Sequence, residues 1–249
     1  MTVRHDGLAV EWLGYATVRL ASEDTVVYLD PGRYGVLTGA WTPDTPDVGH
    51  PPARDYRAGD ADVVCVSHAH HYDPDGIERV AGDDATVVIF DGLDVHRTDR
   101  DVERPADLPY DVVTVGQEDE LLVEDVPLWT VPAYNHPDGP NVREDGTPVH
   151  PEGFGCGFLL DLDGTRVFWP GDTDVLDGHA ELDVSLLLPS IASSFTMDRH
   201  DAAALAAEMD PDLVLPIHYD TFAALEADSR AFAAEVAAAG VPVVLDEGE

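Results

Sequence analysis

The feature that most constrains this chain is an apolar run that leads directly into three histidines and an aspartate. Residues 63–66 are small or β-branched and apolar, a pattern typical of a short buried strand. The polar residues and loop formers that come next are His68, His70, His71, Asp73, Pro74 and Gly76. His68 and His70 are two positions apart, so in an extended chain both side chains point the same way and can share one ion. The stretch therefore predicts a strand that presents metal ligands at its carboxyl end.

The composition predicts a well-packed protein with an unusual charge. The chain has 249 residues, of which 44% are hydrophobic, and its net charge is −37 because it contains 50 acidic residues and only 13 basic ones. A compact fold with this much like charge repels itself in dilute salt. We therefore expect a protein that works at high salt, as in the cytoplasm of a halophile. The acidity also argues against strong non-specific binding to nucleic acid or to an anionic membrane.

Other global features favour a single cytoplasmic domain over residues 1–249. Cys65 and Cys156 lie in apolar, strand-like runs, so both are predicted to be buried thiols. The N-terminus lacks a basic and apolar targeting signal, and no apolar run approaches the length of a membrane span. We expect no membrane partner.

The order of the predicted elements indicates layered sheets with helices outside them. Strands are expected over residues 8–20 with a break at Gly14, and over 25–31, before a long loop. A helix at 74–80 precedes strands at 85–90, 110–115, 121–123 and 128–131, and a second loop covers 132–154. The pair Asp163 and Gly164 predicts a hairpin between strands 157–162 and 165–169. The remaining expected elements are strand 184–188, helix 197–209, strand 213–217, helix 222–239 and strand 241–245. This order is typical of an α/β protein.

Four loops far apart in the sequence each follow a strand and carry metal-binding side chains. They hold, in order, His68, His70, His71 and Asp73; Asn135, His136 and His150; Asp172; and His218. Imidazole together with carboxylate suits zinc first, and then iron or manganese. About six such ligands can hold two ions, with Asp172 as a bridge between them. Either His136 or His150 is the expected ligand from the second loop.

At these residues the sequence resembles the metallo-β-lactamase fold superfamily, and within it the metal-dependent hydrolases similar to ascorbate-phosphate lactonase. The likeness covers nearly the whole chain. The stretches that carry it are WLGYATV at 12–18, YLDP at 28–31, SHAH at 67–70, VPAYN at 131–135 with His150, GDTD at 171–174 and PIHY at 216–219. The resemblance implies a four-layer αβ/βα sandwich with the metals at the strand ends between the two sheets.

The chain departs from the pattern His-x-His-x-Asp-His of that superfamily. Tyr72 stands at the position of the family's Asp, and Asp73 stands at the position of the last His of the pattern. Asp73 is then expected to bind the second ion through oxygen. Tyr72 cannot accept a proton near neutral pH. The candidate donors of a hydrogen bond to the substrate are Tyr72, Tyr134 and Tyr219. In an extended backbone His71 points away from His70, which leaves it either as a ligand or as a residue behind the ligands.

These observations predict a metal-dependent hydrolase that uses a metal-activated water. The substrate would be a small molecule with an ester, lactone or phosphoester bond. The predicted metal ligands are His68, His70, His71, Asp73, His150, Asp172 and His218, and the predicted catalytic residues are Tyr72, Asp73, Asp172 and His218. One or two Zn²⁺ ions are the expected cofactors, with Mn²⁺ or Fe²⁺ as alternatives. The competing hypotheses are a non-catalytic metal-binding module of the same fold and a nuclease.

Overall fold

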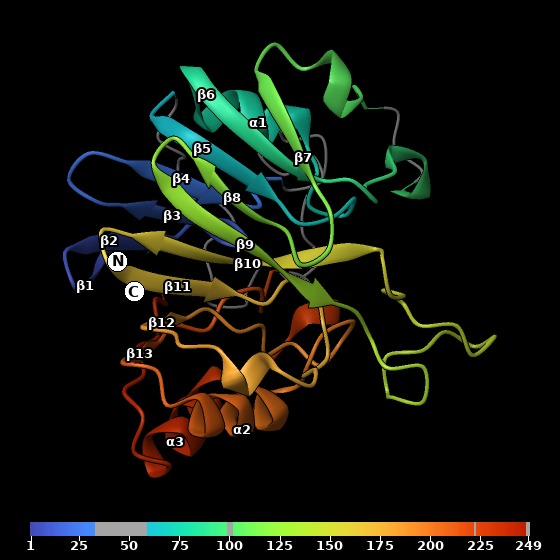
Figure 1. The fold of residues 1–249 in the computed structure, drawn as a ribbon. Helices are drawn as coiled ribbons and strands as arrows, with labels where there is room; N and C mark the ends of the chain where they lie inside the picture. Colours follow the sequence, from blue (N-terminus) through green and yellow to red (C-terminus); the bar gives the residue numbers. More distant parts are fainter. Residues whose placement is uncertain (33–58, 99–101, 222, 248–249) are drawn as a thin grey trace.

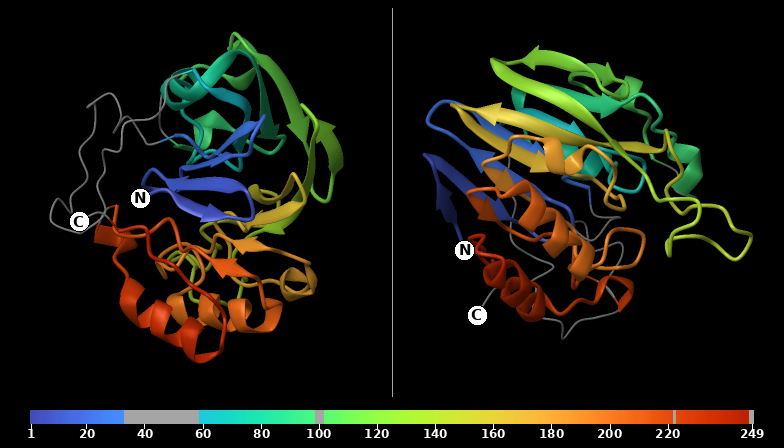
Figure 2. Two further views of the ribbon diagram at one scale, coloured as in Figure 1. Left: turned by 90° about the vertical axis from the view of Figure 1, so that its left-hand side faces the viewer. Right: turned by 60° about the horizontal axis from the view of Figure 1, so that its bottom comes forward.

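Two β-sheets form the centre of the protein, and helices lie against their outer sides (Figure 1). The computed structural model describes residues 1–32, 59–98, 102–221 and 223–247. The long loop predicted after residue 31 falls largely outside these ranges. Helix α1 (Pro74–Val80) covers the seven-stranded sheet, whereas α2 (Arg199–Met209) and α3 (Ser229–Ala238) lie on the side of the six-stranded sheet, as both views in Figure 2 show. The predicted four-layer α/β sandwich is thereby confirmed.

The seven-stranded sheet is antiparallel in its first half and parallel in its second half. Its strands, in both spatial and sequence order, are β1 (Val3–His5), β2 (Leu8–Trp12), β3 (Val18–Ala21), β4 (Val26–Leu29), β5 (Ala61–Val66), β6 (Ala81–Phe90) and β7 (Asp111–Val115). Strands β4 to β7 run parallel. Because parallel strands end at one edge, the chain that leaves β5 is delivered beside the chain that leaves β4.

The six-stranded sheet has the order β13-β12-β11-β10-β9-β8. Its strands are β8 (Glu120–Val123), β9 (Val126–Ala133), β10 (Gly155–Leu162), β11 (Thr165–Trp169), β12 (Leu186–Leu187) and β13 (Leu213–Val214). Strands β10 and β11 form the predicted hairpin, and Asp163 and Gly164 take φ values of 55° and 88° in its turn. Strands β11, β12 and β13 are parallel, so their carboxyl ends meet at one edge.

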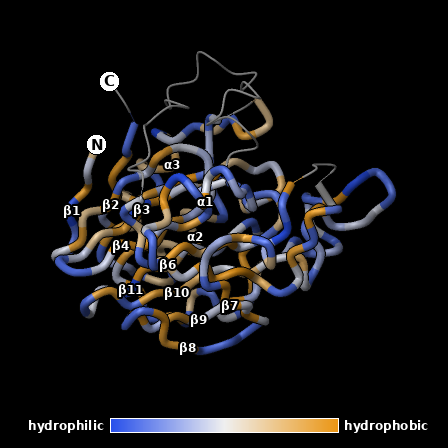
Figure 3. The backbone as a smooth tube through the Cα atoms, turned by 90° about the horizontal axis from the view of Figure 1, so that it is seen from above, coloured by the Kyte–Doolittle hydropathy of each residue, from blue (hydrophilic) through white to orange (hydrophobic). Residues whose placement is uncertain are grey.

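The alternation of apolar side chains explains why the two sheets stack. In β5, Val63 and Cys65 join the core between the sheets, whereas Val64 and Val66 join the cluster under α1. This strand is buried on both faces, as a parallel strand between two layers must be. Figure 3 shows hydrophobic residues concentrated in the strands and hydrophilic residues in the outlying loops. Cys65 and Cys156 are buried free thiols, as predicted.

The last part of the chain differs from its predicted elements. The final helix begins only at Ser229, where the side chain of Asp228 caps it by accepting a hydrogen bond from the N–H of Ala231. The expected strand at 241–245 is reduced to a single bridge between Val214 and Val243. Among the described residues, no helix combines the length and apolar character needed to cross a membrane.

Candidate metal centre

The chain turns immediately after β5, and the turn brings His71 into the same cluster as His68 and His70. The N–H groups of His71 and Tyr72 donate to the carbonyl oxygen of His68 at 3.2 and 3.1 Å. The backbone is therefore not extended through His71, and the condition under which His71 would point away from His70 is not met. The ring centroids of His70 and His71 lie 5.2 and 4.3 Å from that of His68. One short segment thus supplies three clustered imidazoles.

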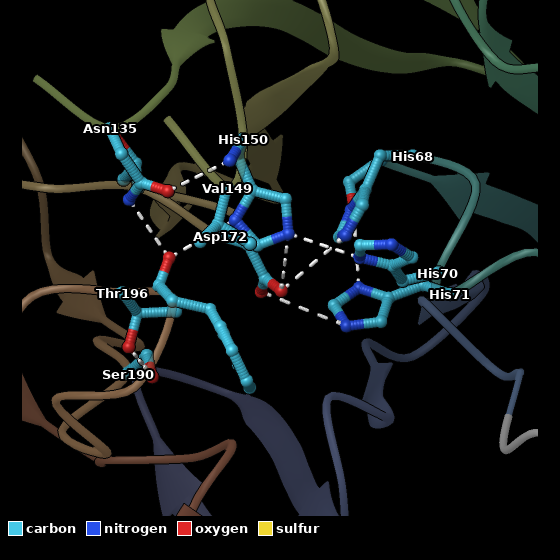
Figure 4. A network of polar contacts seen from close by, with 12 residues as sticks. His68, His70, His71, Asn135, Val149, His150, Asp172, Ser190 and Thr196 are labelled. Atoms are coloured by element: carbon cyan, nitrogen blue, oxygen red, sulfur yellow. Dashed lines mark hydrogen bonds and ion pairs between the residues drawn. The ribbon is translucent and has the colours of Figure 1, made fainter. Parts of the chain in front are cut away.

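A first group of ligand atoms gathers around one oxygen of Asp172. The group comprises His68, His70, His150 and Asp172, whose candidate ligand atoms all lie within 4.8 Å of one another. Nε2 of His68 and Nε2 of His150 lie 3.4 and 3.7 Å from Oδ2 of Asp172. Nδ1 of His70 lies 3.0 Å from Nε2 of His150. Figure 4 shows these side chains converging from different segments on the Asp172 carboxylate.

A second group gathers around the other oxygen of the same carboxylate. It comprises His71, Asp172 and His218. Nε2 of His218 and Nε2 of His71 lie 3.4 and 3.7 Å from Oδ1 of Asp172, and the two Nε2 atoms lie 3.0 Å apart. Asp172 therefore belongs to both groups, through one oxygen each, as the predicted bridging role requires.

Asp30, at the end of β4, fixes the orientation of two of these imidazoles. Its fully buried Oδ2 accepts hydrogen bonds from Nδ1 of His71 at 3.0 Å, from Oγ of Ser67 at 2.7 Å and from Nε1 of Trp169 at 2.7 Å. Because the Ser67 hydroxyl proton points to Asp30, Ser67 Oγ accepts from Nδ1 of His68 at 2.9 Å. This network assigns the protons of His68 and His71 to Nδ1 and leaves their Nε2 lone pairs facing Asp172.

A separate network fixes His150. Its Nδ1 donates to the carbonyl oxygen of Phe195 at 3.1 Å, and its backbone N–H donates to Oδ1 of Asn135 at 2.9 Å. Nδ2 of Asn135 in turn donates to Phe195 and to the buried carboxylate of Asp174. His136 donates its backbone N–H to Asp174 and belongs to neither ligand group. Of the two predicted candidates, the structure therefore brings His150 into the cluster.

Burial favours the neutral form of four clustered imidazoles by lowering their pKa values, those of His68, His70, His150 and His218. It lowers the pKa of His70 to about 2, that of His150 to about 3 and that of His218 to about 4. Burial alone would raise the pKa of Asp172, but His218, His71 and His68 outweigh it and hold this pKa well below the usual value. Neutral imidazoles around an ionised carboxylate are the protonation states that metal ions require.

The cluster fits metal ions better than it fits a network of hydrogen bonds. Nε2 of His68 and Oδ1 of Asp172 are buried without a hydrogen-bond partner. The lone pair of His68 Nε2 faces a carboxylate with no proton between them, which is unfavourable unless a cation lies there. Ligand atoms about 2.0–2.2 Å from a tetrahedral ion lie about 3.3–3.6 Å from one another. The separations of 3.0–3.7 Å in both groups are close to that range.

Two predicted site residues lie elsewhere. Tyr72 is completely buried in the cluster under α1, and its hydroxyl donates to the carbonyl oxygen of Glu103 at 2.9 Å. It therefore cannot serve as a donor to a substrate. Asp73 is the N-cap residue of α1 and belongs to neither ligand group. Of the predicted ligands His71 and Asp73, the turn after His68 places His71 beside His218.

The chain matches a family model described as the beta-lactamase superfamily domain over residues 9–218. It is 28% identical over 198 residues to a UPF0173 metal-dependent hydrolase of Archaeoglobus fulgidus, covering 76% of this chain and 74% of the relative. It is 29% identical over 208 residues to a UPF0173 metal-dependent hydrolase of Thermococcus kodakarensis, covering 78% of this chain and 76% of the relative.

Solved structures show the same fold at lower identity. The crystal structure of a Parabacteroides distasonis protein assigned as a metal-dependent hydrolase matches with a TM-score of 0.71 and 20% identity, over 97% of this chain and 94% of that one. CmlA, a diiron beta-hydroxylase from Streptomyces venezuelae, matches with a TM-score of 0.56 and 15% identity, over 96% of this chain and 53% of that one. The chain therefore belongs to the beta-lactamase superfamily and has the metallo-β-lactamase fold.

Proposed function

We propose that the two ligand groups hold two metal ions and that the protein hydrolyses an ester, lactone or phosphoester bond of a small molecule. The observation that carries this proposal is the position of Asp172, whose two oxygens each face a separate set of imidazole nitrogens. The first ion would be held by His68, His70, His150 and Asp172, and the second by His71, Asp172 and His218. The names of the relatives, which are metal-dependent hydrolases, support the same proposal.

When bound, such ions lower the pKa of water and stabilise the negative charge that develops on the substrate oxygen. The protein's own residues supply the geometry. Asp30 holds the Nδ1 proton of His71, and the Phe195 carbonyl holds that of His150, so neither ring can rotate away. In ester hydrolysis the oxygen of water bonds to the acyl carbon, the bond to the alcohol oxygen breaks, and the alcohol leaves with a proton.

Zinc is the first candidate for the metal, with iron and manganese next, because both groups combine imidazole with carboxylate. The match to a diiron enzyme of the same fold makes iron worth testing directly. Elemental analysis of protein purified without added metal, followed by reconstitution with each ion, identifies the preferred metal.

The test of the proposal is metal stoichiometry combined with activity in matched variants. We expect two ions per chain in the parent protein, and one each in His150→Ala and in His218→Ala. Asp172→Ala should weaken both sites. Hydrolysis of a panel of esters, lactones and phosphodiesters should fall at least about 10²-fold in all three, since outer-shell changes alone cost about 10–100-fold. The exposed His96 provides a control in His96→Ala, which should match the parent protein. Two bound ions without hydrolysis of any substrate would instead favour the non-catalytic module.

A further inference from the structure

Phe195 has a backbone conformation that a bulky residue seldom adopts. Its φ is 73°, in the left-handed region, and Ser193 two residues earlier has a φ of 59°. Such conformations persist only where the surrounding structure holds them, and they gather at functional sites. Phe195 therefore requires an explanation both for its backbone and for its side chain.

The backbone of Phe195 is held by three polar side chains. Its carbonyl oxygen accepts from Nδ1 of His150 at 3.1 Å and from Nδ2 of Asn135 at 2.9 Å, and its N–H donates to Oδ1 of Asn141 at 3.0 Å. These bonds explain the strained backbone, because the carbonyl must point at His150. They do not explain a phenylalanine, since Gly or Asn would adopt this φ more readily.

The ring of Phe195 lies beside His150, a member of the first ligand group, and Phe195 is 38% exposed to solvent. It is one of three large hydrophobic residues that are exposed in the described part of the chain. The other two, Met1 and Leu122, lie at the N-terminus and on the edge strand β8. The Phe195 ring centroid is 6.5 Å from that of His150, with the planes at 81°. An exposed aromatic ring at this place offers apolar surface directly beside the candidate metal centre.

Phe154 lies on the same ligand group and is nearly buried. Its ring centroid is 5.6 Å from that of His68, 5.2 Å from that of His70 and 5.3 Å from that of His150. The two phenylalanines therefore both contact the imidazole of His150, and only Phe195 presents a large exposed surface.

We propose that Phe195 forms the apolar wall of a substrate subsite next to His150, and that the substrate carries an alkyl or aryl group next to the bond that is hydrolysed. This inference rests on the proposed hydrolase function and narrows its substrate class. An apolar group that packs on the Phe195 ring removes both surfaces from water, at about a fourfold gain in binding for each buried methylene. A substrate whose corresponding group is charged would gain nothing from this wall.

The test uses phenyl alkanoate esters with acyl chains of two to eight carbons and the metal-loaded protein. We expect kcat/KM to rise by up to about fourfold per methylene until the subsite is filled. Phe195→Ala and Phe195→Gly should flatten this dependence while metal content stays at the parent value. Phe195→Gly also relieves the left-handed strain, so it keeps the carbonyl available to His150. Leu122→Ala, which removes an equally apolar side chain at 66% exposure, should keep the parent dependence.

A binding measurement separates this inference from the proposed function. Calorimetry with the corresponding alkanoates reports the apolar contact without turnover, so chain-length dependence that is lost in Phe195→Gly supports the subsite even if no ester is hydrolysed. The inference is overturned if chain length affects neither kcat/KM nor binding, or if both variants keep the parent dependence on chain length. It is also overturned if the protein prefers acyl chains that carry a carboxylate at the far end, where the apolar wall is expected. Loss of metal in both variants would also overturn it, because the residue would then act only through His150.

Discussion

At the scale of single residues, Asp30 is the group on which the second ligand set depends. It orients His71 directly and His68 through Ser67, and it also accepts from Trp169 on β11 of the other sheet. A carboxylate behind a metal-binding imidazole fixes the tautomer and raises the basicity of the ligand. Burial alone would raise the pKa of Asp30, but His71 and His68 and the hydrogen bond from Ser67 lower it below the usual value. Asp30 is thus ionised in the folded protein.

Asp30→Asn should weaken the binding of the second ion by about 10–100-fold. The asparagine amide keeps one acceptor oxygen for the four donors that contact Asp30 and adds N–H groups, so His71 loses its fixed tautomer. Titration with metal against a chromogenic chelator, in the His150→Ala background, measures this site alone. Asp174→Asn is the matched variant, because Asp174 supports Asn135 and hence the first ion. It should leave the second ion nearly unaffected, and equal losses in both variants would contradict the separate roles.

The sequence predicted most members of the two candidate ligand groups but not the residues that orient them. His68, His70, Asp172 and His218 stood at strand ends, and strand ends were recognisable from their apolar runs. The inward position of His71 depends on a turn within residues 68–72 that contains no Gly, Pro or Asn to announce it. Asp30 contacts Ser67 and His71 beyond the neighbouring strand and Trp169 in the other sheet, and no local pattern encodes such contacts. The signal that the sequence offered for Asp30 was its position directly after a buried strand.

At the scale of elements, the site depends on the place where β5 and β10 meet. His68 forms an isolated bridge with Gly155, and the N–H of Cys156 donates to the carbonyl oxygen of Ser67 at 3.2 Å. The two sheets are therefore joined next to the first ligand. Both strands were predicted from their apolar runs, but their mutual approach was not, because pairing between distant segments leaves no periodic signal in the sequence.

Gly155→Ala should disturb this junction. A Cβ at Gly155 would lie 2.8 Å from Cβ of His68 and 3.1 Å from the carbonyl oxygen of Ser67. Ser67 is held by Asp30, so the backbones must separate, at about 1–3 kcal/mol of unfolding free energy. Urea unfolding at constant KCl measures this loss, and metal titration should show weaker binding of the first ion. Gly116→Ala, whose Cβ would meet nothing closer than 3.4 Å, is the control. Equal stability of the two variants would show that the junction tolerates a methyl group.

At the scale of the whole molecule, the excess of negative charge has the greatest influence on the stability of the fold. The 50 acidic residues outnumber the 13 basic ones. The ion pair of Arg104 with Asp107 joins two exposed side chains, and that of Arg166 with Asp183 joins a half-buried side chain to an exposed one. Exposed pairs contribute about 0–1 kcal/mol each, so their screening costs little. Repulsion among the excess carboxylates has the greater effect on stability, and salt weakens it.

Raising KCl from 0.1 to 1 M should therefore raise the thermal midpoint by several degrees. The Debye length falls from about 10 to about 3 Å over this range, and each ~1 kcal/mol gained moves the midpoint by about 2–4 °C for a chain of this size. Sucrose at matched osmolality separates screening from solvent exclusion, and it should have a smaller effect. A variant with glutamine at Glu118, Glu120, Glu144 and Glu152, all exposed, should start from a higher midpoint and respond less to KCl. If this variant keeps the full salt response, or if sucrose reproduces it, repulsion between carboxylates is not what limits the stability of the fold.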